Sequence, residues 1–191
     1  MNDWERKKII ALWEKLVVFG YIDTPIDPRT IVLDFDTPLK HDHQFRCQFT
    51  ARKKFRGGIK YELTISLWGT DRDIGFAIVR TDETLRNYFK QYGIPLNYKT
   101  GMIFALLHEV GHLDGYLRHH LAGEKSYKEY RRLQKEEQRT YKQLIKNVTT
   151  RKEADRIYRQ MSTEMFCDYY ALNRLRVIVQ DSRFSIEEYW Y

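Results

Sequence analysis

The spacing of apolar residues changes along the chain, and this change limits the possible folds more than any other feature. After an amphipathic helix predicted at 4–18, apolar and polar residues alternate in several stretches between residues 31 and 78, most clearly in IKYELTISL at 59–67. Such alternation predicts strands with one buried and one solvated face, as in antiparallel sheets. From about residue 82 the apolar spacing becomes helical, and Thr81 or Asp82 can cap the first helix, which is predicted to end at about Tyr92. This order predicts an α+β fold, with a small antiparallel sheet followed by a helical half.

The composition indicates one globular domain over residues 1–191, with 42% apolar and 31% charged residues. A charge-rich stretch at 124–148 with few apolar residues predicts a largely exposed helix, which we interpret as an insertion. We expect a cytoplasmic protein, because no stretch resembles a signal peptide or a membrane span and only two cysteines occur, Cys47 and Cys167. The net charge of +7 is compatible with nucleic acid or an acidic partner, although a solvated basic surface is the favoured explanation.

The sequence HEVGH at 108–112 is the strongest functional signal. It lies on a helix predicted from about residue 100 to 117. One apolar stripe at helical spacing is the predicted core face of this helix: Ile103, Leu106, Leu107, Val110, Leu113 and Leu117. His108 and His112 are four residues apart, so both imidazoles project from one side of that helix and can bind one zinc ion. Glu109 is turned about a third of the way round the helix, where it can reach a metal-bound water rather than the metal. The pattern therefore predicts a zinc site.

Two residues compete for the third ligand position, since catalytic zinc usually has three protein ligands and one open position. His119 follows in nearly the metzincin order, with Gly115 at the expected turn, but Arg118 occupies the ligand position and cannot bind metal. The other candidate is Glu164, on a helix predicted over 151–179. Asp168 lies four residues later on the same side, where it can accept the second ring N–H of His108. We therefore favour Glu164.

These two motifs together resemble the gluzincins, the thermolysin-like zinc peptidases. The text Glu164-x-x-Cys167-Asp168-x-x-Ala171 is similar to the signature of the small ImmA/IrrE-like metallopeptidases. The resemblance covers residues 98–117 and 161–175. It implies that the zinc ligands are His108, His112 and Glu164. It also implies that Glu109 is the general base and that Asp168 is a carboxylate behind a ligating histidine.

The chain departs from the family pattern at two points. Fifty-one residues separate His112 from Glu164, and the predicted insertion at 124–148 accounts for the excess. Cys167 stands where the family has a small residue, and we expect both cysteines to pack in the core. The sequence also contains no recognisable DNA-reading module, so a repressor-linked role is not implied.

The function predicted from these residues is zinc-dependent hydrolysis of peptide bonds in a peptide or protein substrate. Glu109 would accept the proton of the attacking water. The sequence does not identify the transition-state donor: Tyr98, Tyr169 and Tyr170 are possible, but most tyrosines serve packing. A strand at 74–80 could bind the substrate along its edge or be an ordinary internal strand. The alternative is a non-catalytic zinc-containing protein whose basic surface contacts nucleic acid or an acidic protein. An open position on the metal distinguishes the two.

Overall fold

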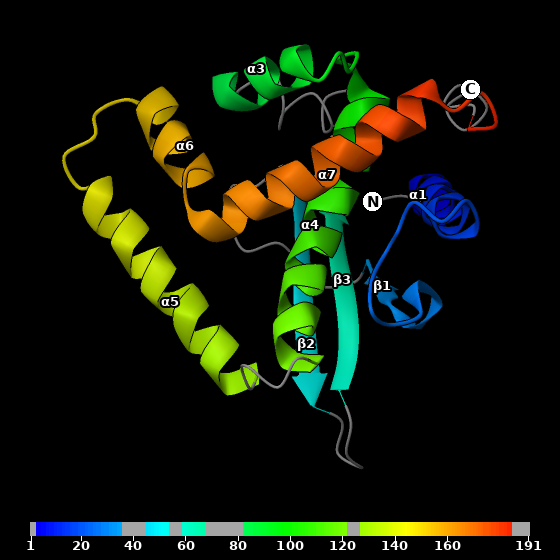
Figure 1. Cartoon of the computed structure of the whole chain (residues 1–191), viewed down its shortest axis with the longest axis horizontal. Coiled ribbons are helices and arrows are strands. Elements are labelled where there is room, and N and C mark those ends of the chain that lie inside the picture. Colours follow the sequence, from blue (N-terminus) through cyan, green and yellow to red (C-terminus); the bar gives the residue numbers. More distant parts are fainter. Residues whose placement is uncertain (1–2, 36–44, 54–58, 68–81, 122–126, 185–191) are drawn as a thin grey trace.

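The computed structural model describes residues 3–35, 45–53, 59–67, 82–121 and 127–184 (Figure 1). Its elements in chain order are α1 (Asp3–Val18), the 3-10 helix η1 (Pro28–Thr30), β1 (Val32–Asp34), β2 (Phe45–Lys53), β3 (Ile59–Leu67), α3 (Glu83–Gln91), α4 (Tyr98–Leu121), α5 (Tyr127–Leu144), α6 (Arg151–Arg159) and α7 (Ser162–Gln180). Two sequence expectations fall outside the described residues, namely the strand at 74–80 and the structure of the 124–126 segment.

The predicted α+β fold with a small antiparallel sheet is wrong. The described structure is mostly helical, and its strands form one short sheet in the order β1-β3-β2. β2 and β3 pair antiparallel, but β1 runs parallel to β3, with Val32 opposite Glu62. Alternating side chains report which faces of a strand are buried and not the direction of its neighbour. The sequence pattern therefore located the strands but could not give their orientation.

Helix α4 lies at the centre of the fold, between α7 on one side and β2 on the other (Figure 1). It is buried over most of its circumference, although only one apolar stripe was predicted. The predicted stripe is confirmed, because all of its members are at most 1% exposed: Ile103, Leu106, Leu107, Val110, Leu113 and Leu117. Packing on two sides fixes the position of this helix, and with it the two motif histidines.

The single helix predicted over 151–179 is wrong, since the chain breaks between α6 and α7 at residues 160–161. The N-cap of α7, Met161, makes no side-chain capping bond. Glu137 of α5 caps α7 instead. Its Oε1 atom accepts hydrogen bonds of 3.0 Å from the Thr163 N–H and the Ser162 hydroxyl. A carboxylate at a helix N-terminus satisfies free N–H groups and opposes the helix dipole. This cap comes from a distant helix, so the local sequence did not reveal the break.

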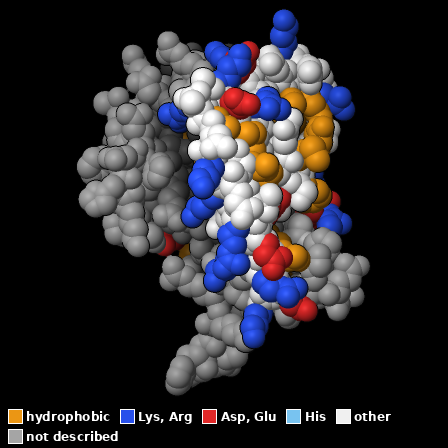
Figure 2. Space-filling view, turned by 90° about the vertical axis from the view of Figure 1, so that its left-hand side faces the viewer, with side chains coloured by type: hydrophobic (Ala, Val, Ile, Leu, Met, Phe, Trp, Pro, Cys, Tyr) orange, Lys and Arg blue, Asp and Glu red, His pale blue; other side chains and the backbone are white. Residues whose placement is uncertain are grey.

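Helix α5 lies on the outside of the fold and is mostly exposed, as the polar composition of 124–148 predicted. On the face shown in Figure 2, Lys and Arg side chains are spread among acidic, apolar and uncharged ones. The helix is anchored by Tyr130, whose ring lies 5.0 Å from that of Tyr116 on α4. The ring contact therefore joins α5 to α4, and the Glu137 cap joins α5 to α7. Within the described residues, no helix is both long and apolar enough to span a membrane.

Candidate metal centre

The candidate site forms where α4 and α7 cross. His108 and His112 project from α4 with ring centroids 5.0 Å apart, and the facing residues of α7 are polar. Gly111, between the two histidines, allows the helices to approach closely: a Cβ atom at this position would lie 3.0 Å from the Cα of Cys167. Any larger residue at 111 would therefore push α7 away from the histidine pair.

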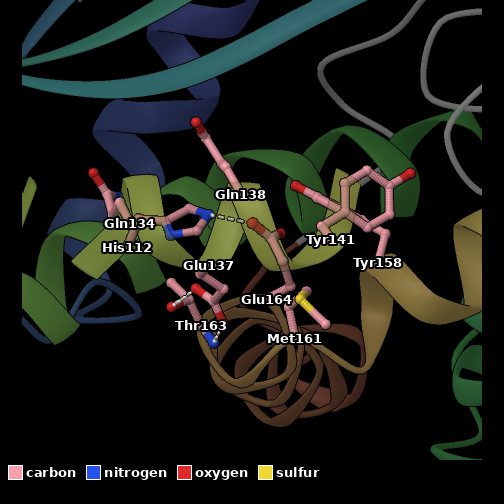
Figure 3. Close-up of a pocket in the computed structure, with 9 residues that line it drawn as sticks. All are labelled: His112, Gln134, Glu137, Gln138, Tyr141, Tyr158, Met161, Thr163 and Glu164. Carbon is pink, nitrogen blue, oxygen red and sulfur yellow. Dashed lines mark hydrogen bonds and ion pairs between the residues drawn. The ribbon is translucent and has the colours of Figure 1, made fainter. Parts of the chain in front are cut away.

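Glu164 bridges the two histidines. Its Oε2 atom lies 3.2 Å from His108 Nε2, and its Oε1 atom lies 3.7 Å from His112 Nε2. Figure 3 shows His112 and Glu164 facing each other, with this contact dashed. Two ligands that are 2.0–2.1 Å from a tetrahedral zinc ion lie about 3.3 Å apart. The separations of Glu164 from His108 and His112, 3.2 Å and 3.7 Å, are therefore close to those that a common zinc ion requires.

Asp168 lies behind His108 and orients its ring. The Asp168 Oδ1 atom is 2.9 Å from His108 Nδ1, and the carboxylate is 1% exposed. This hydrogen bond is the one that the sequence predicted. It requires a proton on Nδ1, so Nε2, the nitrogen that faces Glu164, is the one that can bind a metal after it loses its own proton.

The same contacts set the charges of the metal-free site. Burial by itself would lower the pKa of His108, but hydrogen bonds with Asp168 and Glu164 raise it to about 9. Burial would likewise raise the pKa of Glu164, but His108 and His112 lower it to about 2. Near neutral pH the metal-free pair is therefore an imidazolium and a carboxylate. A metal ion that binds here must displace the Nε2 proton of His108.

Arg159 of α6 connects the site to the rest of the fold. Its Nη1 atom donates to Asp168 Oδ1 at 2.8 Å, and its Nε atom donates to Asp82 Oδ2 at 2.9 Å. Asp82 caps α3, as the sequence predicted, by accepting from Leu85 N–H at 3.1 Å. The chain Asp82–Arg159–Asp168–His108 thus joins four helices through buried polar groups. The sequence did not indicate Arg159, because its partners are distant along the chain.

Cys167 is a further donor at the site, where only a packing role was expected. Its side chain is fully buried, and its Sγ atom and one nitrogen each of His108 and His112 all lie within 4.8 Å of one another. This cluster could hold a metal ion. Burial, with Glu164 and Glu109 nearby, raises the pKa of the Cys167 thiol well above its ordinary value. Metal binding would oppose that effect, because a coordinated thiol loses its proton.

Tyr158, which was not among the expected candidates, contacts the site. Its hydroxyl hydrogen-bonds Glu164, and burial together with the Glu164 charge raises its pKa far above the ordinary value. The expected tyrosines lie elsewhere: Tyr170 donates to the Asp23 carbonyl, and Tyr169 is exposed and stacks on Tyr88.

The break between α6 and α7 explains why Tyr158 was missed. On one continuous helix, residues 158 and 164 would point in different directions, about 240° apart. Because the chain turns at 160–161, both side chains line the same small cavity. Tyr98, the remaining expected candidate, is partly buried and packs against the hydrophobic core.

Glu109, the expected general base, is half-buried on α4. Its charge contributes to the raised pKa values of Tyr158 and Cys167, which places its carboxylate within electrostatic range of the site. It is also one of the groups that raise the pKa of His108.

Two cavities meet at His112. The smaller, about 60 Å³, is also lined by Glu164, Tyr158 and Met161 and is drawn in Figure 3. The larger, about 680 Å³, lies between α5 and the α4–α7 pair and includes Gly111 and Cys167 in its lining. A volume of this size is in the range of ligand-binding pockets. Helix α5, interpreted as a peripheral insertion, lines both cavities.

The alternative ligand, His119, does not fit the backbone of α4. The helix continues without a break through Gly115 to Leu121, so no turn brings the chain back toward the histidine pair. Seven residues of helix place the backbone of His119 about 10 Å beyond that of His112. Arg118 pairs with Asp114 at 2.7 Å. The expectation that the helix ends before His119 is therefore wrong, and the metzincin-like arrangement is not formed.

Comparisons with protein-family models, with curated proteins and with solved structures found no match to this chain. The candidate site is therefore supported by the geometry of its own residues.

Proposed function

We propose that the protein is a zinc-dependent metalloendopeptidase of the gluzincin kind, resembling the small ImmA/IrrE-like metallopeptidases and acting in the cytoplasm. The arrangement of Asp168, His108 and Glu164 supports this proposal most strongly. The Asp168 carboxylate accepts a hydrogen bond from Nδ1 of His108, and the Glu164 carboxylate faces Nε2, between the two histidines. A ligating histidine needs this division of its two nitrogens.

The donor set fits zinc, with His108, His112 and Glu164 as the ligands. Two imidazoles and one carboxylate are the protein ligands of many hydrolytic zinc sites. When bound, zinc would polarise the peptide carbonyl and lower the pKa of a bound water toward about 7. Asp168 would hold His108 in the tautomer that leaves Nε2 free for the metal.

The remaining groups would handle the proton and the substrate. Glu109 would accept a proton from the attacking water and deliver it to the leaving nitrogen. Tyr158 stays protonated and would keep its hydroxyl hydrogen bond to Glu164, which would hold this ligand in position. The 680 Å³ cavity beside His112 would bind the peptide segment that is cleaved.

A peptide-library digest with the zinc-loaded protein tests this proposal. We expect cleavage by the native protein and a loss of about 10²–10⁴-fold or more for Glu109→Gln, with zinc retained, because Glu109 transfers protons and does not hold the metal. Glu153→Gln, at an exposed position on α6, is the matched control and should keep full activity. Near-normal cleavage by Glu109→Gln would show that the assigned mechanism is wrong.

One observation favours the alternative, a non-catalytic zinc protein. Cys167 provides a fourth donor, and a site closed by four protein ligands is typical of structural zinc. In that case the basic surface would bind nucleic acid or an acidic protein. A zinc-loaded protein that cleaves no library peptide, both as the native chain and as Cys167→Ala, would support this alternative.

A further inference from the structure

Cys167 lies where a metal ligand would be, and its position depends on the packing of the two helices. It is fully buried on α7, one residue before Asp168 and three after Glu164, and it faces Gly111 on α4. A Cβ atom at position 111 would lie 3.4 Å from the Sγ atom. The thiol therefore lies at the level of the histidine pair, held there by the close approach of α4 and α7.

Glu164 and Cys167 reach the histidine pair from different sides. Glu164 lines the small cavity of about 60 Å³ and does not line the large one, whereas Cys167 lines the large cavity of about 680 Å³ and not the small one. His112 borders both cavities. The carboxylate and the thiol thus flank the histidine pair from two cavities, and a metal ion bound to the pair could take both as ligands.

We propose that Cys167 is a fourth ligand of the metal centre, which completes a closed set with His108, His112 and Glu164 and keeps the resting peptidase latent. This inference rests on the proposed function. Zinc accepts thiolate ligands at about 2.3 Å and is four-coordinate when closed, so no position is left for a catalytic water. Hydrolysis then requires that one protein ligand leave the metal.

Cys167 is the ligand that leaves. Glu164 is held by the Tyr158 hydroxyl and borders a cavity too small for a peptide. Cys167 borders the cavity that is large enough to admit one. A peptide that enters the large cavity would reach the part of the site that Cys167 borders, where a water or the peptide carbonyl would replace the thiolate as ligand and the released thiolate would take up a proton from solvent. Substrate entry would thus open the site.

Cobalt(II) substitution tests the thiolate ligand without relying on activity. The cobalt-loaded native protein should show a thiolate-to-cobalt charge-transfer band in the near ultraviolet together with tetrahedral d–d bands. Cys167→Ser and Cys167→Ala should lose the charge-transfer band and bind cobalt on the order of tenfold more weakly or worse, since a thiolate contributes directly to the binding free energy. Cys47→Ser is the matched control and should keep the band.

The activity of the same variants tests latency. Zinc-loaded Cys167→Ala should cleave peptides at least as fast as the native protein, because its fourth position is open, and alanine adds no bulk against Gly111. Native protein that binds cobalt tetrahedrally without a charge-transfer band would overturn the inference and leave the three-ligand site intact. A band that persists in Cys167→Ser would also overturn it. Native protein that binds no cobalt would overturn both this inference and the proposed function.

Discussion

Replacing Arg159 with methionine should strongly destabilise the protein. The side chains of Arg159, Asp82 and Asp168 are 11%, 9% and 1% exposed, so this ion network is almost fully removed from water. Methionine fills a similar volume but leaves two buried carboxylates without their shared cation. Breaking a buried ion pair costs about 3–5 kcal/mol. Because whole domains are stable by only about 5–15 kcal/mol, this loss is a large part of the total.

Urea unfolding of the metal-free protein at neutral pH measures the effect as a lower transition midpoint at unchanged slope. Arg156→Met is the matched control on the same helix. Arg156 is 52% exposed and pairs with Glu153 at 3.7 Å, so its loss should cost about 1 kcal/mol or less. Arg159→Lys should fall between the two variants, because lysine keeps the charge but cannot reach both carboxylates with a planar fork. If Arg159→Met and Arg156→Met unfold at the same urea concentration, the network does not hold the helices together as the distances indicate.

Three further predictions concern the metal ligands and the α7 cap. In Cys167→Ala, which has no thiol proton to release, zinc affinity should rise about tenfold per pH unit from pH 7 to about 9 and then level off, because His108 must release one proton on binding and its pKa is about 9. An affinity that isothermal titration finds flat over this range would show that His108 carries no proton to displace in the metal-free site. Glu164→Ala should lower zinc affinity sharply, while His119→Ala should change it little. If a chelator competition instead shows that His119→Ala loses zinc affinity and Glu164→Ala keeps it, His119 is the third ligand, as in the metzincin-like arrangement. Glu137→Ala should lower stability by about 1–2 kcal/mol through the loss of the α7 cap, which a thermal melt measures, and an unchanged melt would show that the cap does not contribute.

The sequence predicted those features whose signal is local. The apolar stripe of α4 is visible in its own spacing, and the Asp82 cap of α3 lies next to the helix that it caps. The contact between Asp168 and His108 spans 60 residues, yet it was predictable because a ligating histidine needs a partner for its second nitrogen. In each case the residues of one short segment indicate the contact that the segment needs.

The features that were missed depend on residues far apart in the chain. Glu137 caps the start of α7 from 26 residues away, and no residue near Met161 reports this. The resulting break moves Tyr158 to the site. The parallel direction of β1 is likewise set by its neighbour in the sheet and not by its own alternation. Cys167 was predicted to be a core residue because it is small and apolar. Only its distance to the histidines shows that its thiol could also bind a metal ion.

Metal analysis of the purified protein tests the central proposal most directly. Zinc content by elemental analysis, with isothermal titration of the metal-free protein, should give one zinc ion per chain for the native sequence. The double variant His108→Ala/His112→Ala should bind essentially none, because it removes both nitrogens that face Glu164. The double variant Arg132→Ala/Glu136→Ala, a surface pair on α5 with the same four-residue spacing, controls for indirect effects and should keep its zinc. Full zinc occupancy in the histidine double variant would contradict the proposed metal centre.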